Sequence, residues 1–242
     1  MGLFDFLSGG SDPQKQIDKV KRRLMDQYRQ SHDRYDAMDE LARIKTPASL
    51  QALLDRFTLR ISGPTVDEQE KEYCYTLVAK WGPDAIEPLQ TFIATRDAIY
   101  FPLRALGELA GEDAAVDALL KAMADCNPGY HEGLERLREI VSNLRDFRHD
   151  RVRQALISLL ASNNSEIRFF ALDGLTAYPG DVVAPEVAAR MMDPNESQRV
   201  KALAFELAVE HQWPLTPWAE AIRPVLPASY QFDAAGLLQR RP

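Results

Sequence analysis

The sequence predicts an all-α protein, a right-handed α-solenoid of about eleven or twelve helices arranged as helical hairpins. Apolar residues recur at spacings of three and four almost throughout the 242 residues, which is the period of a helix. Residues that end and start helices separate these stretches, and one apolar pattern returns at a fixed offset. Such repetition is typical of solenoids, in which each hairpin buries its apolar face against the next.

The composition along the chain divides it into four predicted segments. Residues 1–12 form an apolar arm with a flexible Gly- and Ser-containing linker. A single long polar helix is expected over residues 13–45. The repeat array follows over residues 46–211, and residues 212–242 are expected to form a cap, closed by Trp213 and Trp218, and an irregular tail.

The boundaries between the predicted helices carry recognisable start signals. Pro47, Pro83 and Pro194 each fit the first position of a helix, where the missing amide proton costs nothing. Asp193 and Glu196 have the spacing of a capping box, in which a side chain caps the helix and a glutamate reciprocates three residues later. These signals predict short turns between helices.

A repeated pattern of one large apolar residue, one alanine and one apolar residue at i, i+4 and i+8 sets the period. Its copies begin at Phe101, Ile167 and Val200. These positions lie 66 and 33 residues apart, which indicates a unit of about 33 residues. Stepping 33 residues back from Ile167 places Arg138 where alanine is expected, so that copy is either degenerate or shifted to Leu137 and Val141.

A basic residue follows the branched apolar residue in two copies, Ile167-Arg168 and Val200-Lys201. In these residues the chain resembles the HEAT-like repeat family of armadillo-type α-solenoids, in its short bacterial form, over roughly residues 46–211. Pro102 departs from this pattern, because an arginine is usual there. The resemblance implies a scaffold or adaptor whose curved surface binds a partner protein, with Arg168 and Lys201 among the contact residues.

No motif for catalysis, a cofactor or a metal is found. The chain has no Gly-rich phosphate loop and no nucleophile elbow. HEAT-like deoxyhypusine hydroxylases bind iron through several His-Glu dipeptides, and this chain has one, His131-Glu132. We therefore predict no enzyme activity, no cofactor and no metal. The alternatives are a HEAT-like enzyme of the DNA glycosylase or bilin lyase type, and a membrane-proximal assembly factor that uses the N-terminal arm.

The charge distribution makes a nucleic-acid partner an unfavoured prediction. The net charge is -7, and residues 46–242 hold 20 basic against 28 acidic side chains. Binding to a phosphate backbone requires clustered Lys and Arg. A protein partner is therefore favoured.

Three groups of side chains are candidate contacts. The arm carries four large apolar residues, which dock onto the solenoid itself, a partner or a membrane interface. They are Leu3, Phe4, Phe6 and Leu7. A basic stripe at helical spacing follows, Lys15, Lys19, Arg22 and Arg23, which is either a partner site or a solvated helix face. Arg148 and Arg151, in a cluster with Arg145 and Arg153, are either a clamp for acidic groups or an internally paired network.

The expected location is cytoplasmic, with peripheral contact at the inner membrane through the arm as a further alternative. The two cysteines, Cys74 and Cys126, form neither a CxxC motif nor a disulfide framework. No run of eighteen apolar residues and no signal peptide is present.

Overall fold

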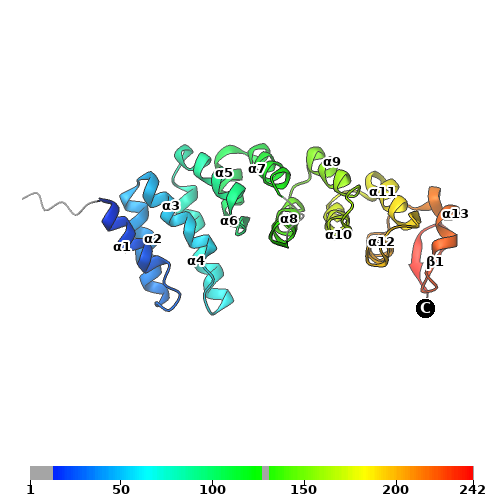
Figure 1. Ribbon diagram of the computed structural model, residues 1–242, viewed down its shortest axis with the longest axis horizontal. Helices are drawn as coiled ribbons and strands as arrows, with labels where there is room; N and C mark the ends of the chain where they lie inside the picture. Colours follow the sequence, from blue (N-terminus) through cyan, green and yellow to red (C-terminus); the bar gives the residue numbers. More distant parts are fainter. Residues whose placement is uncertain (1–12, 127–130, 242) are drawn as a thin grey trace, which may run out of the picture. The chain divides into compact units, whose positions relative to one another are not determined.

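The computed structural model describes residues 13–126 and 131–241, and these are almost entirely helical (Figure 1). Besides short 3-10 turns, their elements are thirteen α-helices and one two-stranded β-hairpin. The all-α prediction is confirmed. The chain divides into two compact units, Met1–Ala122 and Met123–Pro242, each of which is described by itself.

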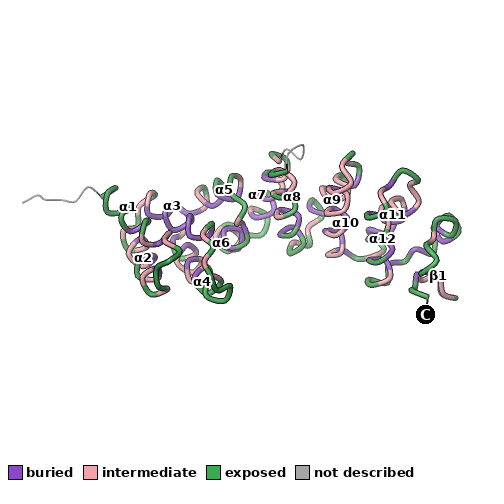
Figure 2. The backbone as a smooth tube through the Cα atoms, turned by 60° about the horizontal axis from the view of Figure 1, so that its bottom comes forward, coloured by how far each residue is buried: buried purple, intermediate pink, exposed green. Residues whose placement is uncertain are grey.

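The first unit is built of helical hairpins in two layers. The first helices of the hairpins, α1, α3 and α5, contact one another in sequence order, and so do the second helices, α2, α4 and α6. Buried residues occur in every one of these helices (Figure 2). The bounds are α1 (Pro13–Leu24), α2 (Ser31–Ile44), α3 (Pro47–Asp55), α4 (Pro64–Ala79), α5 (Ile86–Thr95), α6 (Tyr100–Ala110) and α7 (Glu112–Ala124).

Two helices replace the single helix that was predicted over residues 13–45. The chain leaves α1 after Leu24 and turns back into α2, so that the apolar faces of both helices are buried. The Asp26 carboxylate stabilises the turn by accepting from the Tyr28 backbone N–H at 3.0 Å. Arg34 of α2 donates to the Arg29 backbone oxygen and closes the turn. Residues 25–30, which form this turn, contain neither Gly nor Pro, so the usual signals of a break between helices are missing.

A carboxylate bound by two arginines is buried inside the first unit. Glu70 of α4 is fully buried, and it pairs with Arg34 of α2 at 2.7 Å and with Arg56, just after α3, at 2.8 Å. Ion pairs join three helices here in a place where apolar side chains are usual. The cluster fixes α4 against α2 and α3.

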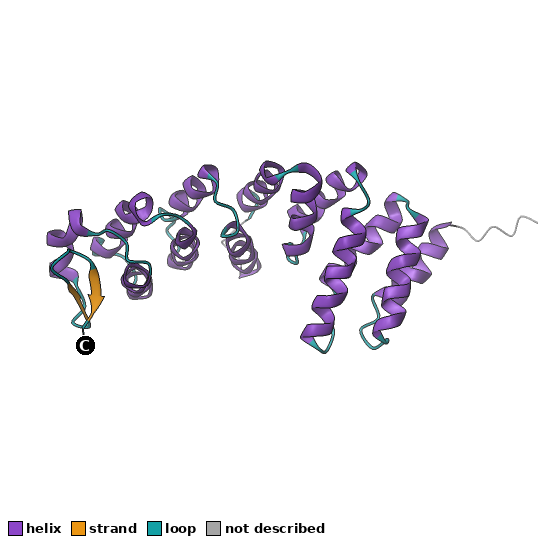
Figure 3. Cartoon of the chain, turned by 180° about the vertical axis from the view of Figure 1, so that it is seen from behind, coloured by secondary structure: helices purple, strands orange, loops and turns teal. Residues whose placement is uncertain are grey.

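The second unit repeats the hairpin arrangement and ends in a short hairpin of strands. Helix α10 packs against α8, α9 and α12, and α11 packs against α12 and α13. The strands are orange in Figure 3. The bounds are α8 (His131–Leu144), α9 (Asp150–Leu159), α10 (Ser165–Gly174), α11 (Gly180–Met192), α12 (Gln198–Glu210), α13 (Ala219–Ile222), β1 (Tyr230–Phe232) and β2 (Leu238–Arg240).

The predicted repeat positions lie in the core. The alanines of the three copies, at positions 105, 171 and 204, are fully buried, which lets neighbouring helices approach closely. In α8, Leu137 and Val141 are buried and Arg138 is exposed. The shifted alternative for this copy is therefore confirmed.

The start of α12 differs from the predicted capping box of Asp193 and Glu196. Ser197 caps this helix, and its hydroxyl accepts from the Val200 backbone N–H at 3.3 Å. Glu196 does not take part in this cap, and its side chain lies inside the protein, where the residue is 5% exposed. Its partner there is Arg168.

The C-terminal segment is an antiparallel β-hairpin where an irregular tail was predicted. Tyr230 pairs with Arg240 and Phe232 with Leu238. Asp233 holds the connecting turn by accepting from the Leu237 backbone N–H at 2.8 Å. Strands of three residues are too short to show alternation in the sequence.

No helix in the described ranges has both the length and the apolar character needed to cross a membrane.

Candidate functional site

A hollow of about 310 Å³ opens between the second helices of the second unit. Helices α8, α10 and α12 line it with arginines and phenylalanines. We call it the Arg–Phe pocket and define it by Arg138 of α8, Arg145 just after α8, Phe169 and Phe170 of α10, and Arg199 of α12. Glu166 and Asp173 of α10 also line it, so three cations face two carboxylates.

The buried positions of α10 and α12 determine which side chains reach the pocket. Ile167 and Ala171 of α10 point into the core, which leaves the two phenylalanines between them at the edge of the core, half-buried. Arg199 directly precedes the buried Val200 and is exposed. The repeat therefore places aromatic rings and guanidinium groups side by side on one helix layer.

Two of the three arginines lie over aromatic rings. The Arg199 guanidinium is 4.2 Å from the centre of the Phe169 ring, and that of Arg138 is 5.8 Å from the centre of Phe170. Contacts of this kind contribute about 0.5–1 kcal/mol at exposed sites. Within the described ranges, neither Arg138 nor Arg199 pairs with a carboxylate. Arg145 differs, since it pairs with Asp173 at 3.0 Å.

A buried ion pair connects α10, which lines the pocket, to the start of α12. Arg168 donates to both carboxylate oxygens of Glu196, at 2.6 and 2.7 Å, and to the Ser162 backbone oxygen at 2.7 Å. Burial raises the pKa of the Glu196 carboxyl, but hydrogen bonds from Arg168 and from the Ser197 backbone outweigh it, so the pKa lies below its ordinary value. The pair holds the start of α12 against α10.

The chemistry of the Arg–Phe pocket is that of an anion-accepting contact surface. Guanidinium groups form two parallel hydrogen bonds with a carboxylate or phosphate. Aromatic and arginine side chains are also the most frequent residues at energetically important contacts between proteins. Because Arg138 and Arg199 lie over rings and not against carboxylates, their hydrogen-bond donors are available to a ligand.

The predicted contact residues of the second unit lie outside the pocket. The prediction that Arg168 contacts a partner is corrected, because its side chain is 11% exposed and is bound to Glu196. Lys201 is half-buried on α12, Arg148 is exposed between α8 and α9, and Arg151 is exposed on α9. None of these four lines the pocket.

The predicted basic stripe lies on α1 in the first unit. Lys15, Lys19 and Arg22 are exposed, whereas Arg23 is half-buried and donates to Glu40 at 2.6 Å. The apolar residues of the predicted arm lie outside the described residues. They are Leu3, Phe4, Phe6 and Leu7.

Of the residues that define the Arg–Phe pocket, Arg145 was part of a predicted cluster. The other four were missed in the sequence, although a signal for them exists. Phe169 and Phe170 lie between Ile167 and Ala171, which are core positions of the repeat. Since a surface helix buries one face only, residues between two core positions tend to face outward. Two large aromatic residues at such positions indicate an exposed aromatic surface. Arg138 interrupted the period, and its exposure in the structure explains why.

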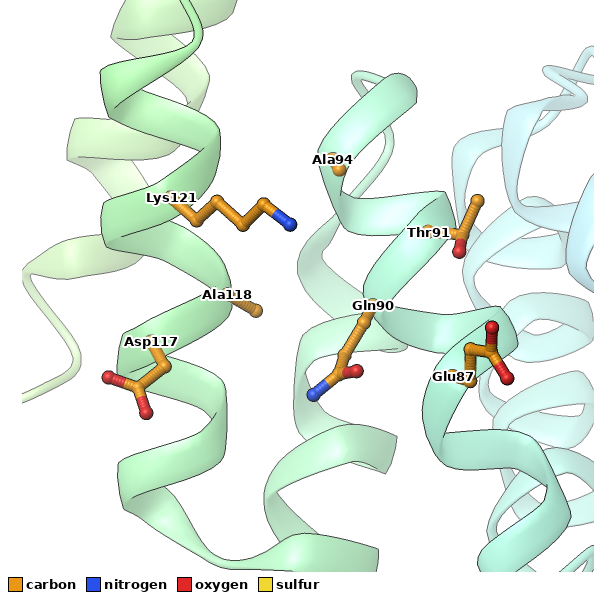
Figure 4. Close-up of a pocket in the computed structure, with 7 residues that line it drawn as sticks. All are labelled: Glu87, Gln90, Thr91, Ala94, Asp117, Ala118 and Lys121. Carbon is orange, nitrogen blue, oxygen red and sulfur yellow. The ribbon is translucent and has the colours of Figure 1, made fainter.

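A second hollow, of about 400 Å³, lies between α5 and α7 of the first unit (Figure 4). Lys121 extends from α7 toward α5, and Gln90 extends from α5 toward α7. Glu87 and Asp117 complete a lining of mixed charge. Because no single charge and no aromatic ring dominates it, this hollow is the weaker candidate.

Among the described side chains, no group of three or more His, Cys, Asp or Glu has the arrangement of a metal site. His131 and Glu132 are exposed at the start of α8.

Fold and pocket together define an all-α protein of helical hairpins with a pocket lined by arginines and phenylalanines. No protein-family model matches the chain, and no curated protein matches it. Human deoxyhypusine hydroxylase in complex with glycerol is similar in structure, with a TM-score of 0.32, 13% identity and coverage of 88% of this chain and 94% of that chain. An engineered protein is similar with a TM-score of 0.37, 16% identity and coverage of 89% and 62%.

The prediction that the chain is not an enzyme is corrected by these comparisons, because one of the similar structures, human deoxyhypusine hydroxylase, is an enzyme. At TM-scores of 0.32 and 0.37, neither similarity transfers a substrate or an activity to this chain. The helical-hairpin fold rests on the elements described above.

Proposed function

We propose that the protein binds an acidic segment of a partner protein and that the Arg–Phe pocket is the contact site. The observation that carries the proposal is the state of Arg138 and Arg199, which lie over phenylalanine rings without a carboxylate partner in the described chain. A carboxylate of the partner accepts hydrogen bonds from these groups, and the rings cover its apolar neighbours.

The acidity of the rest of the protein supports this assignment. With a net charge of -7, most of the chain repels an acidic segment. The Arg–Phe pocket holds three cations against two carboxylates and is a local exception. Within the second unit, repulsion by the acidic side chains elsewhere then favours the pocket, which is how charge patterns between proteins produce specificity.

The wider role follows from the class of repeat. Short bacterial HEAT-like repeats present the second-helix layer to a partner, and we assign the chain a scaffold or adaptor role of this kind. As part of the same proposal, it acts in a reducing cytoplasm, since the chain has two cysteines and no CxxC motif. Binding in this way is compatible with catalysis.

Replacement of one pocket arginine tests the contact. For Arg199→Gln, we expect the dissociation constant of an acidic probe to rise about tenfold, because one charge-assisted hydrogen bond contributes roughly 1.5–3 kcal/mol. The probe is a fluorescein-labelled peptide of alternating glutamate and leucine. Fluorescence anisotropy with the full chain measures its binding.

Arg148→Gln is the matched control, since it removes the same charge from an exposed position of the same unit that does not line the pocket. It should leave the dissociation constant within about twofold, because a rim charge contributes little to affinity. Equal losses in the two variants, or no binding of the peptide to the unaltered protein, would overturn the proposed function.

A further inference from the structure

The first unit contains a second cationic hollow, of about 590 Å³, where α1 ends and turns into α2. It is separate from the Arg–Phe pocket, which belongs to the second unit. Its size falls within the roughly 300–1,000 Å³ of small-molecule sites. Four cations and one carboxylate line it, and we call it the α1–α2 hollow. They are Lys19, Arg22, Arg23, Asp26 and Arg29.

The cations of this hollow are only partly neutralised. Within the described ranges, Lys19 and Arg22 pair with no carboxylate, and Arg22 donates only to the Asp18 backbone oxygen, at 3.3 Å. Arg29 lies 3.5 Å from the Asp26 carboxylate and 3.8 Å from that of Asp33, which are loose contacts. The hollow therefore keeps an excess of positive charge.

Arg23 supplies an independent observation. One of its terminal nitrogens donates to Glu40 at 2.6 Å, but its Nε–H is buried and has no acceptor. Among the described residues, this is the single buried side-chain nitrogen or oxygen without a hydrogen-bond partner. Such a group costs about 1–3 kcal/mol, and an ion or water that satisfies it is a usual explanation.

We propose that the α1–α2 hollow binds a phosphate-bearing anion. The guanidinium groups of Arg22 and Arg29 offer planar pairs of donors that match phosphate oxygens, and Lys19 adds a compact positive charge. An anion in the hollow offsets the excess charge of this set of cations, which includes Arg23 with its unmet donor. A phosphate group suits the hollow better than a carboxylate, because it offers three acceptor oxygens and more negative charge.

Titration calorimetry with inorganic pyrophosphate tests the proposal on the full chain. Unaltered protein should bind pyrophosphate, and the double variant Lys19→Gln/Arg22→Gln should bind it at least about tenfold more weakly. The double variant Arg60→Gln/Lys80→Gln is the charge-matched control. It removes two exposed cations of the same unit that do not line the hollow, and it should bind as the unaltered protein does.

Flotation with vesicles of phosphatidylcholine, with and without phosphatidylglycerol, identifies the source of the phosphate. Pyrophosphate binding that depends on Lys19 and Arg22 assigns a soluble ligand. Retention on vesicles that contain phosphatidylglycerol, with the same dependence and no pyrophosphate binding, assigns a lipid headgroup. Failure of both assays, or an equal loss in the control variant, overturns the site and leaves the Arg–Phe pocket unaffected.

Discussion

Glu70→Ala is expected to lower the free energy of unfolding of the first unit by about 3–5 kcal/mol, because it leaves two buried arginines without their shared counter-charge. Arg34 donates to both Glu70 carboxylate oxygens at 2.7 Å, and Arg56 donates to Oε2 at 2.8 and 3.2 Å. Ser31 completes the shell with a hydrogen bond of 2.7 Å. Without Glu70, Arg56 keeps Asp67 as a carboxylate partner, at 2.9 Å, and the Leu59 backbone oxygen as an acceptor, at 3.2 Å.

Urea denaturation followed by circular dichroism measures the loss, and hydrogen exchange of peptides from α2 and α4 locates it. Glu68→Ala is the matched control, since Glu68 is exposed on the same helix. Surface substitutions of this kind change stability by less than about 0.5 kcal/mol. Equal effects of the two substitutions would contradict the account of the cluster.

The milder variant Glu70→Gln keeps the shape of the side chain and makes the charge effect visible through pH. Burial raises the pKa of the Glu70 carboxyl, but hydrogen bonds from Arg34, Ser31 and Arg56 outweigh it, so the folded pKa lies below 4.5. A depressed folded pKa contributes stability above the unfolded value, and this contribution is lost as the pH falls through the folded pKa. The stability difference between unaltered protein and Glu70→Gln should therefore shrink as the pH falls below 4.5.

The helical-hairpin fold was predictable because its signal is local and repeated. A buried alanine between two apolar positions is required wherever two helices approach closely, so the positions of Ala105, Ala171 and Ala204 recur with the repeat. The turns also carry local chemistry. Thr46 and Ser49 form the capping box that starts α3, with Pro47 in its first position.

Features that depend on distant partners were not predictable. Glu70 looks like any glutamate on a polar helix, and it is buried only because Arg34 and Arg56 reach it from other helices. The break between α1 and α2 likewise depends on Arg34, which holds the turn from the following helix. Neither arrangement leaves a trace in the spacing of residues.

In the candidate site, too, some features follow from the local sequence and others depend on packing. The repeat pattern singled out Arg168 on α10, one of the helices that line the Arg–Phe pocket, but its side chain is bound inside the protein. The pocket uses neighbouring positions instead, Phe169 on the same helix and Arg199 on the next. Which of two adjacent residues faces outward depends on the rotation of each helix, and only packing determines that.

Trp213→Ala is expected to lower the free energy of unfolding of the second unit by about 3–5 kcal/mol, the range for loss of a buried tryptophan. The indole is 2% exposed and stacks on His211 with ring centres 5.6 Å apart. It also packs closely against Gly180, the first residue of α11, since a Cβ added to this glycine would lie 2.5 Å from Trp213 Cδ1. Removal of the ring leaves a cavity between α11 and the chain that follows α12.

Denaturation by urea, followed by circular dichroism, measures this loss without relying on tryptophan emission. Trp218→Ala is the control, because Trp218 is half-buried and leaves a smaller cavity. We expect it to cost less than half as much as Trp213→Ala, since the cost rises with the volume left empty. Faster hydrogen exchange in α11 and α12 should accompany the Trp213 substitution. If both tryptophan variants lose the same stability, Trp213 does not hold the end of the repeat.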